Sequence, residues 1–315
     1  MFEWPAICLE TKIRMAVLSL CLSFFPTVSF GYTILLSEDF ETADLATKGW
    51  YDNTTMTFST TEHITNRGQS LEFHWLPGAK MPTSGGAVRH LFSATTTLYV
   101  SYWVKYQDRY QGSGLTYHPH EVYVLTNADG PFSGLAFNTL NFYIQHIKGN
   151  NGIVPQLEIQ DGKMIDTSKI GTSLVGVTET RAVAGCNGNG NSGGVTVDGV
   201  FGGTDCYPVG GGTYWNSYMW NSPTVRLSTG IWHHVEVYVK MNSISGGIGQ
   251  HDGILRYWLD GLLVIDQSTV IMRTSANPFL MFNQLVLAPY IGAGSPIDQT
   301  FWIDDLTIAT SRIDG

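Results

Sequence analysis

The segment from Ile231 to Met241 constrains the fold more than any other part of the sequence, because its side chains alternate strictly in character. Successive side chains of a β-strand point to opposite faces, so a period of two predicts a strand with two different faces. One face is almost wholly aliphatic: Ile231, His233, Val235, Val237, Val239 and Met241. The other carries rings and charges: Trp232, His234, Glu236, Tyr238 and Lys240. An aliphatic face of this kind packs against a second sheet, which predicts a two-layered β structure.

The same alternation recurs along the rest of the chain, whereas a helical period never persists for three turns. Clusters of Gly, Asn, Asp and Pro separate the alternating segments, as turns separate strands. The further predicted strands are Ser70–Trp75, Thr96–Gln107, Glu121–Thr126, Ala136–Lys148, Ile254–Asp260, Leu280–Ala288 and Thr300–Thr310. Many strands without crossover helices predict an antiparallel sandwich, jelly roll or barrel.

Residues 1–31 have the features of an export signal. Two basic residues precede an apolar run, 15–25, and small residues follow it at Ser29 and Gly31. This pattern is typical of a secretory signal peptide cleaved near Gly31, and a buried N-terminal helix is the alternative. The run is shorter than the roughly 20 residues that a transmembrane helix needs, and no second apolar stretch is long enough. We therefore expect a secreted, extracellular or cell-envelope protein whose mature part, 32–315, is a single domain.

Cleavage of this peptide would leave two cysteines, Cys186 and Cys206, in the mature chain. An exported protein with two cysteines most simply pairs them as a disulfide, and two free thiols are the alternative. The segment 185–212 that contains them is rich in Gly and Asn, so we interpret it as a long loop within the domain. Closing such a loop should stabilise the fold by about 3 kcal/mol in the loop-closure model.

The charge of the chain limits its partners. The 17 Lys and Arg residues are outnumbered by 26 Asp and Glu, which gives a formal net charge of -9. Phosphate binding requires a basic surface, so nucleic acid is not an expected partner. Charged residues make up only 14% of the sequence, which also argues against a disordered chain or a coiled coil.

Several predicted strands carry a second face that is polar but rich in aromatic rings. Such rings can stack on the apolar faces of sugars, although a single Trp on a strand is more often packed under a loop. Charged side chains on the same faces favour an exposed position, because burying so many charges is costly. We therefore expect a concave sheet face that binds a polysaccharide through Trp103, Lys105, Tyr143, Trp232, Glu236, Lys240 and Trp258.

Three short motifs stand in the last third of the chain: Gly230-Ile231-Trp232-His233-His234-Val235-Glu236, Asp252-Gly253 and Tyr257-Trp258-Leu259-Asp260-Gly261. Together they resemble the concanavalin A-like jelly rolls. That superfamily includes laminin-G-like domains, glucanases and polysaccharide lyases of the alginate and glucuronan type. The resemblance implies an all-β, two-sheet antiparallel jelly-roll sandwich, in which Asp260 and Gly261 form a tight turn of positive φ.

Two acidic clusters lie near the ends of the mature chain, Glu38-Asp39-Phe40-Glu41 and Asp304-Asp305. The resemblance implies that the terminal strands pair and that a structural calcium ion lies near their ends. Ca²⁺ takes several oxygen ligands, which clustered carboxylates supply. The candidate ligands are Glu41 and Asp305, followed by Asp39 and Asp304, and solvated acids at strand ends are the alternative. Apart from this calcium, no cofactor is expected.

Two further motifs are similar to those of alginate lyases: Tyr143-Ile144-Gln145-His146 and Tyr238-Val239-Lys240. In the first, Gln145 and His146 are adjacent, so their side chains point to opposite faces of the strand. β-Elimination removes a proton beside a uronate carboxylate, which requires a Tyr or His base and an Arg, Gln or Asn that neutralises the carboxylate. If the protein is a lyase, the candidates for these roles are Tyr238, His234, Arg256 and Gln145.

The cluster Tyr117-His118-Pro119-His120-Glu121 places two histidines on one face of a strand start, with Glu121 turned away. The pair could bind a metal ion, but the spacing identifies no third ligand, and hydrogen-bonding histidines are the preferred interpretation. Retaining glycosidases need two neighbouring carboxylates, and the Glu-x-Asp-x-x-Glu strand of the glucanase relatives is absent. Glycoside hydrolysis is therefore disfavoured.

The sequence thus leads to three hypotheses. The one that the sequence favours is an exported jelly roll that recognises a polysaccharide through a sheet face lined by rings and charges. The second is a polysaccharide lyase that cleaves uronate-containing glycans by β-elimination. The third is a non-catalytic envelope or adhesion protein.

Overall fold

The computed structural model describes residues 31–115, 117–135, 138–161, 196–200, 202, 206–210, 213–274 and 277–313. The chain divides into two compact units, Met1–Gly31 and Tyr32–Gly315, and the following description concerns the second. The predicted signal peptide, except for Gly31, and the greater part of the predicted loop 185–212 lie outside the described residues. No helix in the described ranges is long and apolar enough to cross a bilayer.

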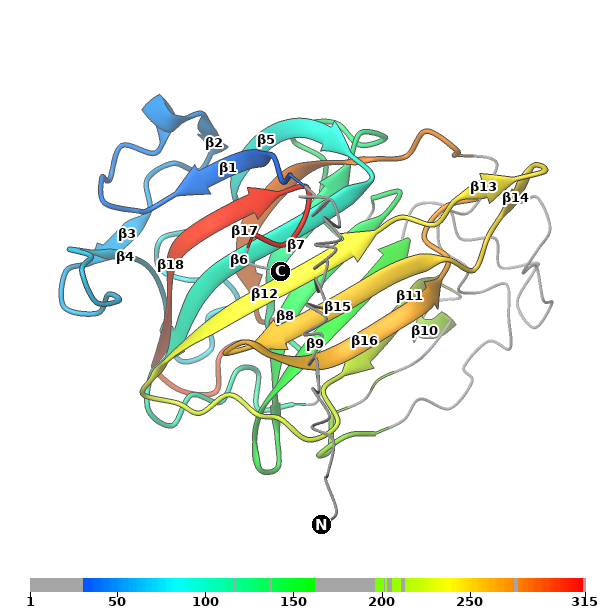
Figure 1. Ribbon diagram of the computed structural model, residues 1–315. Helices are drawn as coiled ribbons and strands as arrows, with labels where there is room; N and C mark the ends of the chain where they lie inside the picture. Colours follow the sequence, from blue (N-terminus) through cyan, green and yellow to red (C-terminus); the bar gives the residue numbers. More distant parts are fainter. Residues whose placement is uncertain are drawn as a thin grey trace, which may run out of the picture. The chain divides into compact units, whose positions relative to one another are not determined.

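Two antiparallel sheets pack face to face in this unit (Figure 1). The strand order in sheet A is β16 (Leu262–Val270), β15 (Gly253–Leu259), β12 (Trp232–Lys240), β6 (Thr97–Tyr106), β18 (Gln299–Ala309), β4 (Ser70–Trp75) and β3 (Thr57–Ser59). The first strand, β1 (Ile34–Glu38), also pairs with β18. The order in sheet B is β10 (Cys206–Gly210), β11 (Thr213–Asn221), β9 (Gly152–Asp161), β8 (Asn141–Gly149), β7 (His120–Thr126), β17 (Phe282–Tyr290), β5 (Val88–Thr95) and β2 (Trp50–Asp52). Smaller elements are the hairpin of β13 (Ile244–Ser245) and β14 (Ile248–Gly249) and the 3-10 turn η1 (Ala46–Lys48).

This architecture confirms the predicted all-β, two-sheet antiparallel jelly roll. Each predicted strand overlaps an observed one, and the terminal strands β1 and β18 pair. On β12, Val235, Val237 and Val239 are fully buried between the sheets, as their aliphatic face predicted. Asp260 and Gly261, with φ of 50° and 80°, form the tight turn between β15 and β16.

Sheet B departs from the sequence prediction more than sheet A does, and β2, β5 and β11 are among its strands that were not predicted. Strand β10 lies inside the segment that we interpreted as a loop, and β8 begins at Asn141 rather than at Ala136. Strand β9 was not predicted, although Gln156 and Glu158 alternate along it with the buried core residues Leu157 and Ile159. Its polar positions supply much of the candidate site.

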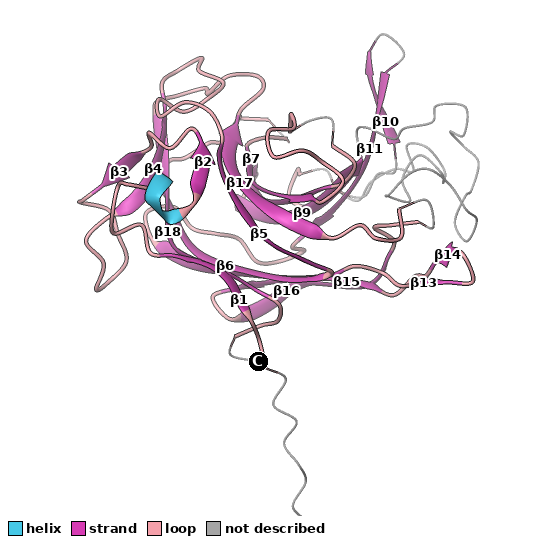
Figure 2. Cartoon of the chain, turned by 90° about the horizontal axis from the view of Figure 1, so that it is seen from above, coloured by secondary structure: helices cyan, strands magenta, loops and turns pink. Residues whose placement is uncertain are grey.

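The hydrophobic core fills the space between the two sheets. Its largest fully buried members include Phe73, Trp75, Tyr102, Phe142, Phe282 and Phe301. A separate, smaller apolar cluster lies on the other face of sheet B and consists of Tyr123, Leu125, Tyr143, Val286 and Ala288. Figure 2 shows that sheet B is curved and that this second face is its concave side, turned away from sheet A.

A polar cluster crosses the core directly behind the concave face. Glu121 of β7 and His146 of β8 belong to sheet B, whereas Tyr106 of β6 and Tyr257 of β15 belong to sheet A. The Tyr106 hydroxyl lies 2.9 Å from both Glu121 oxygens, and His146 Nδ1 lies 2.7 Å from Glu121 Oε2. His146 Nε2 lies 2.6 Å from the Tyr257 hydroxyl. All four side chains are buried, so the cluster ties the two sheets together, and burial raises the pKa of Glu121.

The backbone of β7 is irregular beside this cluster. Regular alternation from Val122, a core residue, would place Glu121 on the concave face. Glu121 instead points into the core together with Val122, and His120 points into the concave face. The register between β7 and β17 also shifts between Leu287 and Tyr290. Across this shift three residue steps on β17 face two on β7, so the extra residue of this β-bulge lies on β17.

Replacing Glu121 by alanine should lower the free energy of unfolding by about 3–5 kcal/mol, because it removes the buried carboxylate that His146 and the Tyr106 hydroxyl both contact and leaves them only each other. Urea unfolding of the purified variant measures this change. The control is Asp266→Ala, which removes the exposed partner of Arg256 and should cost less than about 1 kcal/mol. Equally small losses in both variants would show that the core cluster does not tie the sheets together.

Candidate active site

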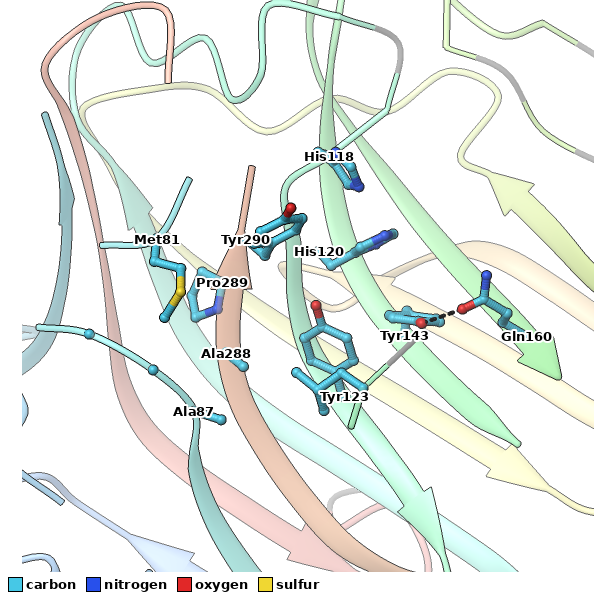
Figure 3. Close-up of a pocket in the computed structure, with 13 residues that line it drawn as sticks. Met81, Ala87, His118, His120, Tyr123, Tyr143, Gln160, Ala288, Pro289 and Tyr290 are labelled. Carbon is cyan, nitrogen blue, oxygen red and sulfur yellow. Dashed lines mark hydrogen bonds between the residues drawn. The ribbon is translucent and has the colours of Figure 1, made fainter. Parts of the chain in front are cut away.

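A cavity of about 430 Å³ lies on the concave face of sheet B (Figure 3). Strands β17, β7, β8 and β9 and the segment before β5 contribute to it, so it crosses the sheet rather than following one strand. Its walls consist of Met81, Gly85, Gly86, Ala87, His118, His120, Tyr123, Leu135, Tyr143, Gln160, Ala288, Pro289 and Tyr290. None of these lining residues is a lysine or an arginine.

Aromatic and imidazole rings form one continuous cluster in this cavity. The ring of Tyr143 lies 4.8 Å from those of Tyr123 and His120, measured between ring centroids. The ring of His118 lies 4.6 Å from that of His120 and 5.6 Å from that of Tyr290. Tyr290 and His120 are also direct neighbours across β17 and β7. Figure 3 shows these rings gathered around the cavity from three adjacent strands and the loop before β7.

His118 is held in a fixed orientation by the segment after β17. Its backbone has a φ of 56°, in the left-handed region, and the backbone N–H of Gly292 donates to its Nδ1 at 3.0 Å. A Cβ on Gly292 would lie 2.5 Å from His118 Cε1, so glycine is required for this close approach. Because Nδ1 accepts a hydrogen bond, the neutral ring carries its proton on Nε2. Burial and the neighbouring His120 lower the pKa of His118 to about 3, which keeps the ring neutral.

His120 has the opposite arrangement. Its Nδ1 lies 2.6 Å from Oε1 of Gln145, and the Gln145 amide nitrogen donates to Gln156 Oε1 at 2.6 Å and to Glu158 Oε2 at 2.8 Å. With its nitrogen engaged by these acceptors, Gln145 can only accept from His120, so His120 Nδ1 carries the proton. Nε2 then holds the lone pair, and no hydrogen-bond partner for it exists in the described part of the chain.

The Tyr143 hydroxyl is placed by two polar neighbours. It donates to Gln160 Oε1 at 2.5 Å and accepts from Asn141 Nδ2 at 2.9 Å. Tyr123 lies beside it, and burial raises the pKa of the Tyr123 hydroxyl well above its usual value. Tyr123 is therefore protonated at neutral pH, and the Tyr143 hydroxyl is a hydrogen-bond donor, so both supply hydroxyl groups and flat ring surfaces.

The structure divides the predicted site residues between the two sheets. Tyr143 and Gln145 lie on β8, at or beside the cavity. All the other predicted ligand-binding and catalytic residues belong to sheet A: Trp103, Lys105, Trp232, His234, Glu236, Tyr238, Lys240, Arg256 and Trp258. Gln145 is therefore not at one site with Tyr238, His234 and Arg256, because the core separates the two faces.

On the outer face of sheet A, several of the predicted binding residues are engaged with one another. The rings of Trp103 and His234 stack at 4.9 Å. Glu236 receives the Tyr99 hydroxyl at 2.8 Å and two nitrogens of Arg312 at 2.8 and 3.0 Å.

The cations of this face have partners as well. Arg312 covers the ring of Trp258 at 4.6 Å. Lys105 pairs with Glu62 at 2.6 Å and Arg256 with Asp266 at 2.9 Å. Much of the charge on this face therefore serves intramolecular contacts.

The predicted calcium ligands lie where β1 ends beside the middle of β18. Asp305 pairs with Arg67, Glu41 accepts from the backbone N–H of Gly68, and Asp39 pairs with Lys48. Asp304 accepts from the backbone N–H of Ile64, and burial raises its pKa to about 6. No group of three or more His, Cys, Asp or Glu side chains among the described residues is arranged to hold a metal ion. Calcium stays a prediction.

Several residues of the cavity were not predicted as site residues. The hydrogen-bonding role preferred for His118 and His120 agrees with their contacts, but the sequence did not connect the pair with Tyr143. Gln156, Glu158, Gln160 and Tyr290 were not identified at all. The alternation of Gln156, Glu158 and Gln160 with Leu157 and Ile159 is the pattern that would have indicated them. Of the predicted disulfide pair, Cys186 lies outside the described residues.

The His118 ring should stay neutral through a pH titration, because of its fixed environment. Nuclear magnetic resonance should show no shift of the His118 ring signals over the range around pH 6.5 in which an ordinary histidine titrates. The variant Gly292→Ala should displace the ring toward solvent and raise the pKa of His118 toward that ordinary value. The variant His118→Gln assigns the signal, and an ordinary titration of His118 in the unmodified protein would contradict this geometry.

Comparison with known proteins bears on the fold. No protein-family model matches the sequence, and a search of curated proteins finds no match. Among solved structures, alginate lyase Aly36B is similar at 17% identity and a TM-score of 0.51, over 88% of this chain and 96% of that one.

Two further solved structures are similar over almost the whole of their chains. Alginate lyase vAL-1 from Chlorella virus has 12% identity and a TM-score of 0.55, over 89% of this chain and 100% of that one. The marine PL-14 alginate lyase from Aplysia kurodai has 15% identity and a TM-score of 0.51, again over 89% and 100%. The chain thus has the concanavalin A-like jelly-roll fold that the motifs in its last third predicted.

Proposed function

We propose that this protein is a polysaccharide lyase that cleaves a uronate-containing glycan by β-elimination on the concave face of sheet B. The observation that carries the proposal is the lone pair of His120 Nε2, held in a cavity lined by tyrosine rings. The fold supports it, because the similar structures are alginate lyases, and a mutant of Aly36B was solved in complex with alginate trisaccharide. Binding or adhesion without catalysis, which the sequence favoured or left open, would not require this fixed lone pair.

The reaction needs three groups around one sugar residue. A base removes the proton from the carbon beside the carboxylate, and hydrogen-bond donors stabilise the negative charge that then develops on that carboxylate. An acid protonates the glycosidic oxygen that leaves. The electron pair of the broken C–H bond forms a carbon–carbon double bond as the C–O bond to the leaving oxygen breaks, so the product carries an unsaturated sugar.

The cavity offers one group for each of these roles. His120 Nε2 takes the proton, because its lone pair has no partner within the described residues. His118, neutral and protonated on Nε2, donates to the carboxylate. The hydroxyl of Tyr290, the neighbour of His120 across the strands, gives a proton to the leaving oxygen. Tyr143 and Tyr123 supply a flat surface for the sugar ring.

Incubation of the purified protein with alginate, glucuronan and related uronate polymers should raise the ultraviolet absorbance as the unsaturated product forms. His120→Gln should lower kcat by roughly 10²–10⁴-fold, the usual contribution of a general base. The matched control is His234→Gln on the outer face of sheet A, which should retain activity. Absence of product from every uronate polymer, or equal activity of the two variants, would contradict the proposal.

Export, the Cys186–Cys206 disulfide and the calcium ion remain proposals from the sequence. For calcium, we expect a chelator to lower the melting temperature, because removal of the ion would leave Glu41, Asp304 and Asp305 to repel one another. Thermal unfolding with and without the chelator measures this effect. An unchanged melting temperature would reject the site.

A further inference from the structure

A path of hydrogen bonds leads from His120 into the buried part of sheet B. His120 Nδ1 contacts Gln145, Gln145 contacts both Gln156 and Glu158, and the Ser217 hydroxyl donates to the second oxygen of Glu158. The path crosses from β7 to β8, β9 and β11, so it connects four neighbouring strands. Only its first member, His120, is partly exposed to the cavity.

The direction of every bond in this path is set by Glu158. The Glu158 oxygen Oε2 accepts from the Gln145 amide nitrogen at 2.8 Å, so the side chain of Gln145 presents its NH₂ group to Glu158. The Gln145 oxygen then faces His120, which leaves Nδ1 as the only possible donor of that bond. Gln156 also accepts from the Gln145 amide nitrogen. Its own nitrogen donates to Asn221 at 2.5 Å, so its oxygen faces Gln145.

Burial makes the path rigid. Gln145, Gln156 and Glu158 are 1%, 2% and 3% exposed, and Ser217 is fully buried. Turning the Gln145 amide over would place its oxygen against the Glu158 carboxylate and leave buried polar groups without partners, which is costly. Water has little access to compensate for such a change.

We propose that Gln145 and Glu158 are positioning residues, which keep the proton of His120 on Nδ1 and direct the lone pair of Nε2 into the cavity. The effect of these residues on catalysis rests on the proposed lyase function, whereas the tautomer of His120 does not depend on it. The sequence made Gln145 a candidate for neutralising the substrate carboxylate. In this assignment it does not have that role. Its two amide hydrogens are already donated to Gln156 and Glu158.

The tautomer can be measured without any substrate. Nitrogen-15 spectra of the histidine side chains, recorded where the rings are neutral, distinguish the protonated nitrogen from the one with the lone pair. We expect His120 to carry its proton on Nδ1 and His118 to carry it on Nε2, so the two residues serve as references for each other. His120→Gln assigns the signal, and a proton on Nε2 of His120 in the unmodified protein would overturn the proposal.

Two variants test the path itself. Gln145→Met keeps the size of the side chain but gives His120 Nδ1 no acceptor, so both tautomers should be populated. If the protein is a lyase, kcat should fall by roughly 10²-fold or more with little change in KM, because an incorrect tautomer removes the base and not the binding. The double variant Q145E/E158Q keeps the total charge and restores an acceptor for Nδ1, since the new amide at position 158 can donate to the new carboxylate at position 145. The Gln156 amide must turn over in this variant, because its oxygen otherwise faces the new carboxylate.

The double variant should recover the Nδ1–H tautomer and a large part of kcat relative to Gln145→Met. A double variant with no more of the Nδ1–H tautomer than Gln145→Met would overturn the proposal, because an acceptor at position 145 would then not hold the proton on Nδ1. The spectra separate a failure of this proposal from a failure of the lyase function. If the expected tautomers are observed but no product forms, only the lyase function is contradicted. The spectrum of the unmodified protein remains decisive if a variant does not fold.

Discussion

Glu121 and His146 meet at 2.7 Å in the core, and the orientation of the candidate active site depends on this contact. A buried carboxylate requires hydrogen-bond donors, which Tyr106 and His146 supply, so Glu121 is held inside the sandwich. His120 precedes Glu121, and Gln145 precedes His146. Because neighbouring residues of a strand point to opposite faces, the same contact directs His120 and Gln145 together into the concave face, where they meet at 2.6 Å. The core cluster and the candidate site therefore lie on opposite faces of the same two strands, β7 and β8.

The fold could be predicted to a large extent because its determinants are local. Alternation along β12 identified the buried face that includes Val235 and Val237, and the pair Asp260-Gly261 identified a turn. The site could be predicted only in part. Alternation shows that Tyr143 lies on a polar face with rings, but it does not show to which sheet a strand belongs. Tyr143 was therefore grouped with Trp103, whose face lies on the opposite side of the molecule.

Two further features of the site depend on contacts between distant parts of the chain. The inward orientation of Glu121 is not visible in the sequence, because its partners Tyr106 and His146 lie on two other strands. The prediction that Glu121 turns away from the two histidines is nevertheless confirmed. On the outer face of sheet A, the charges of Glu236 and Arg256 suggested ligand binding. The counter-charge of Glu236, Arg312, lies in a distant part of the chain, whereas Asp266 faces Arg256 directly across the hairpin of β15 and β16.

His118 and His120 show how two identical side chains, one residue apart, acquire different chemistry. Each ring has two nitrogens, and the partner of one nitrogen decides what the other can do. A backbone N–H reaches Nδ1 of His118, so its Nε2 is a donor. An amide oxygen reaches Nδ1 of His120, so its Nε2 is an acceptor. A cavity whose described walls include no lysine or arginine thus contains both a donor and a base, and it obtains them from the hydrogen-bond partners of two histidine rings.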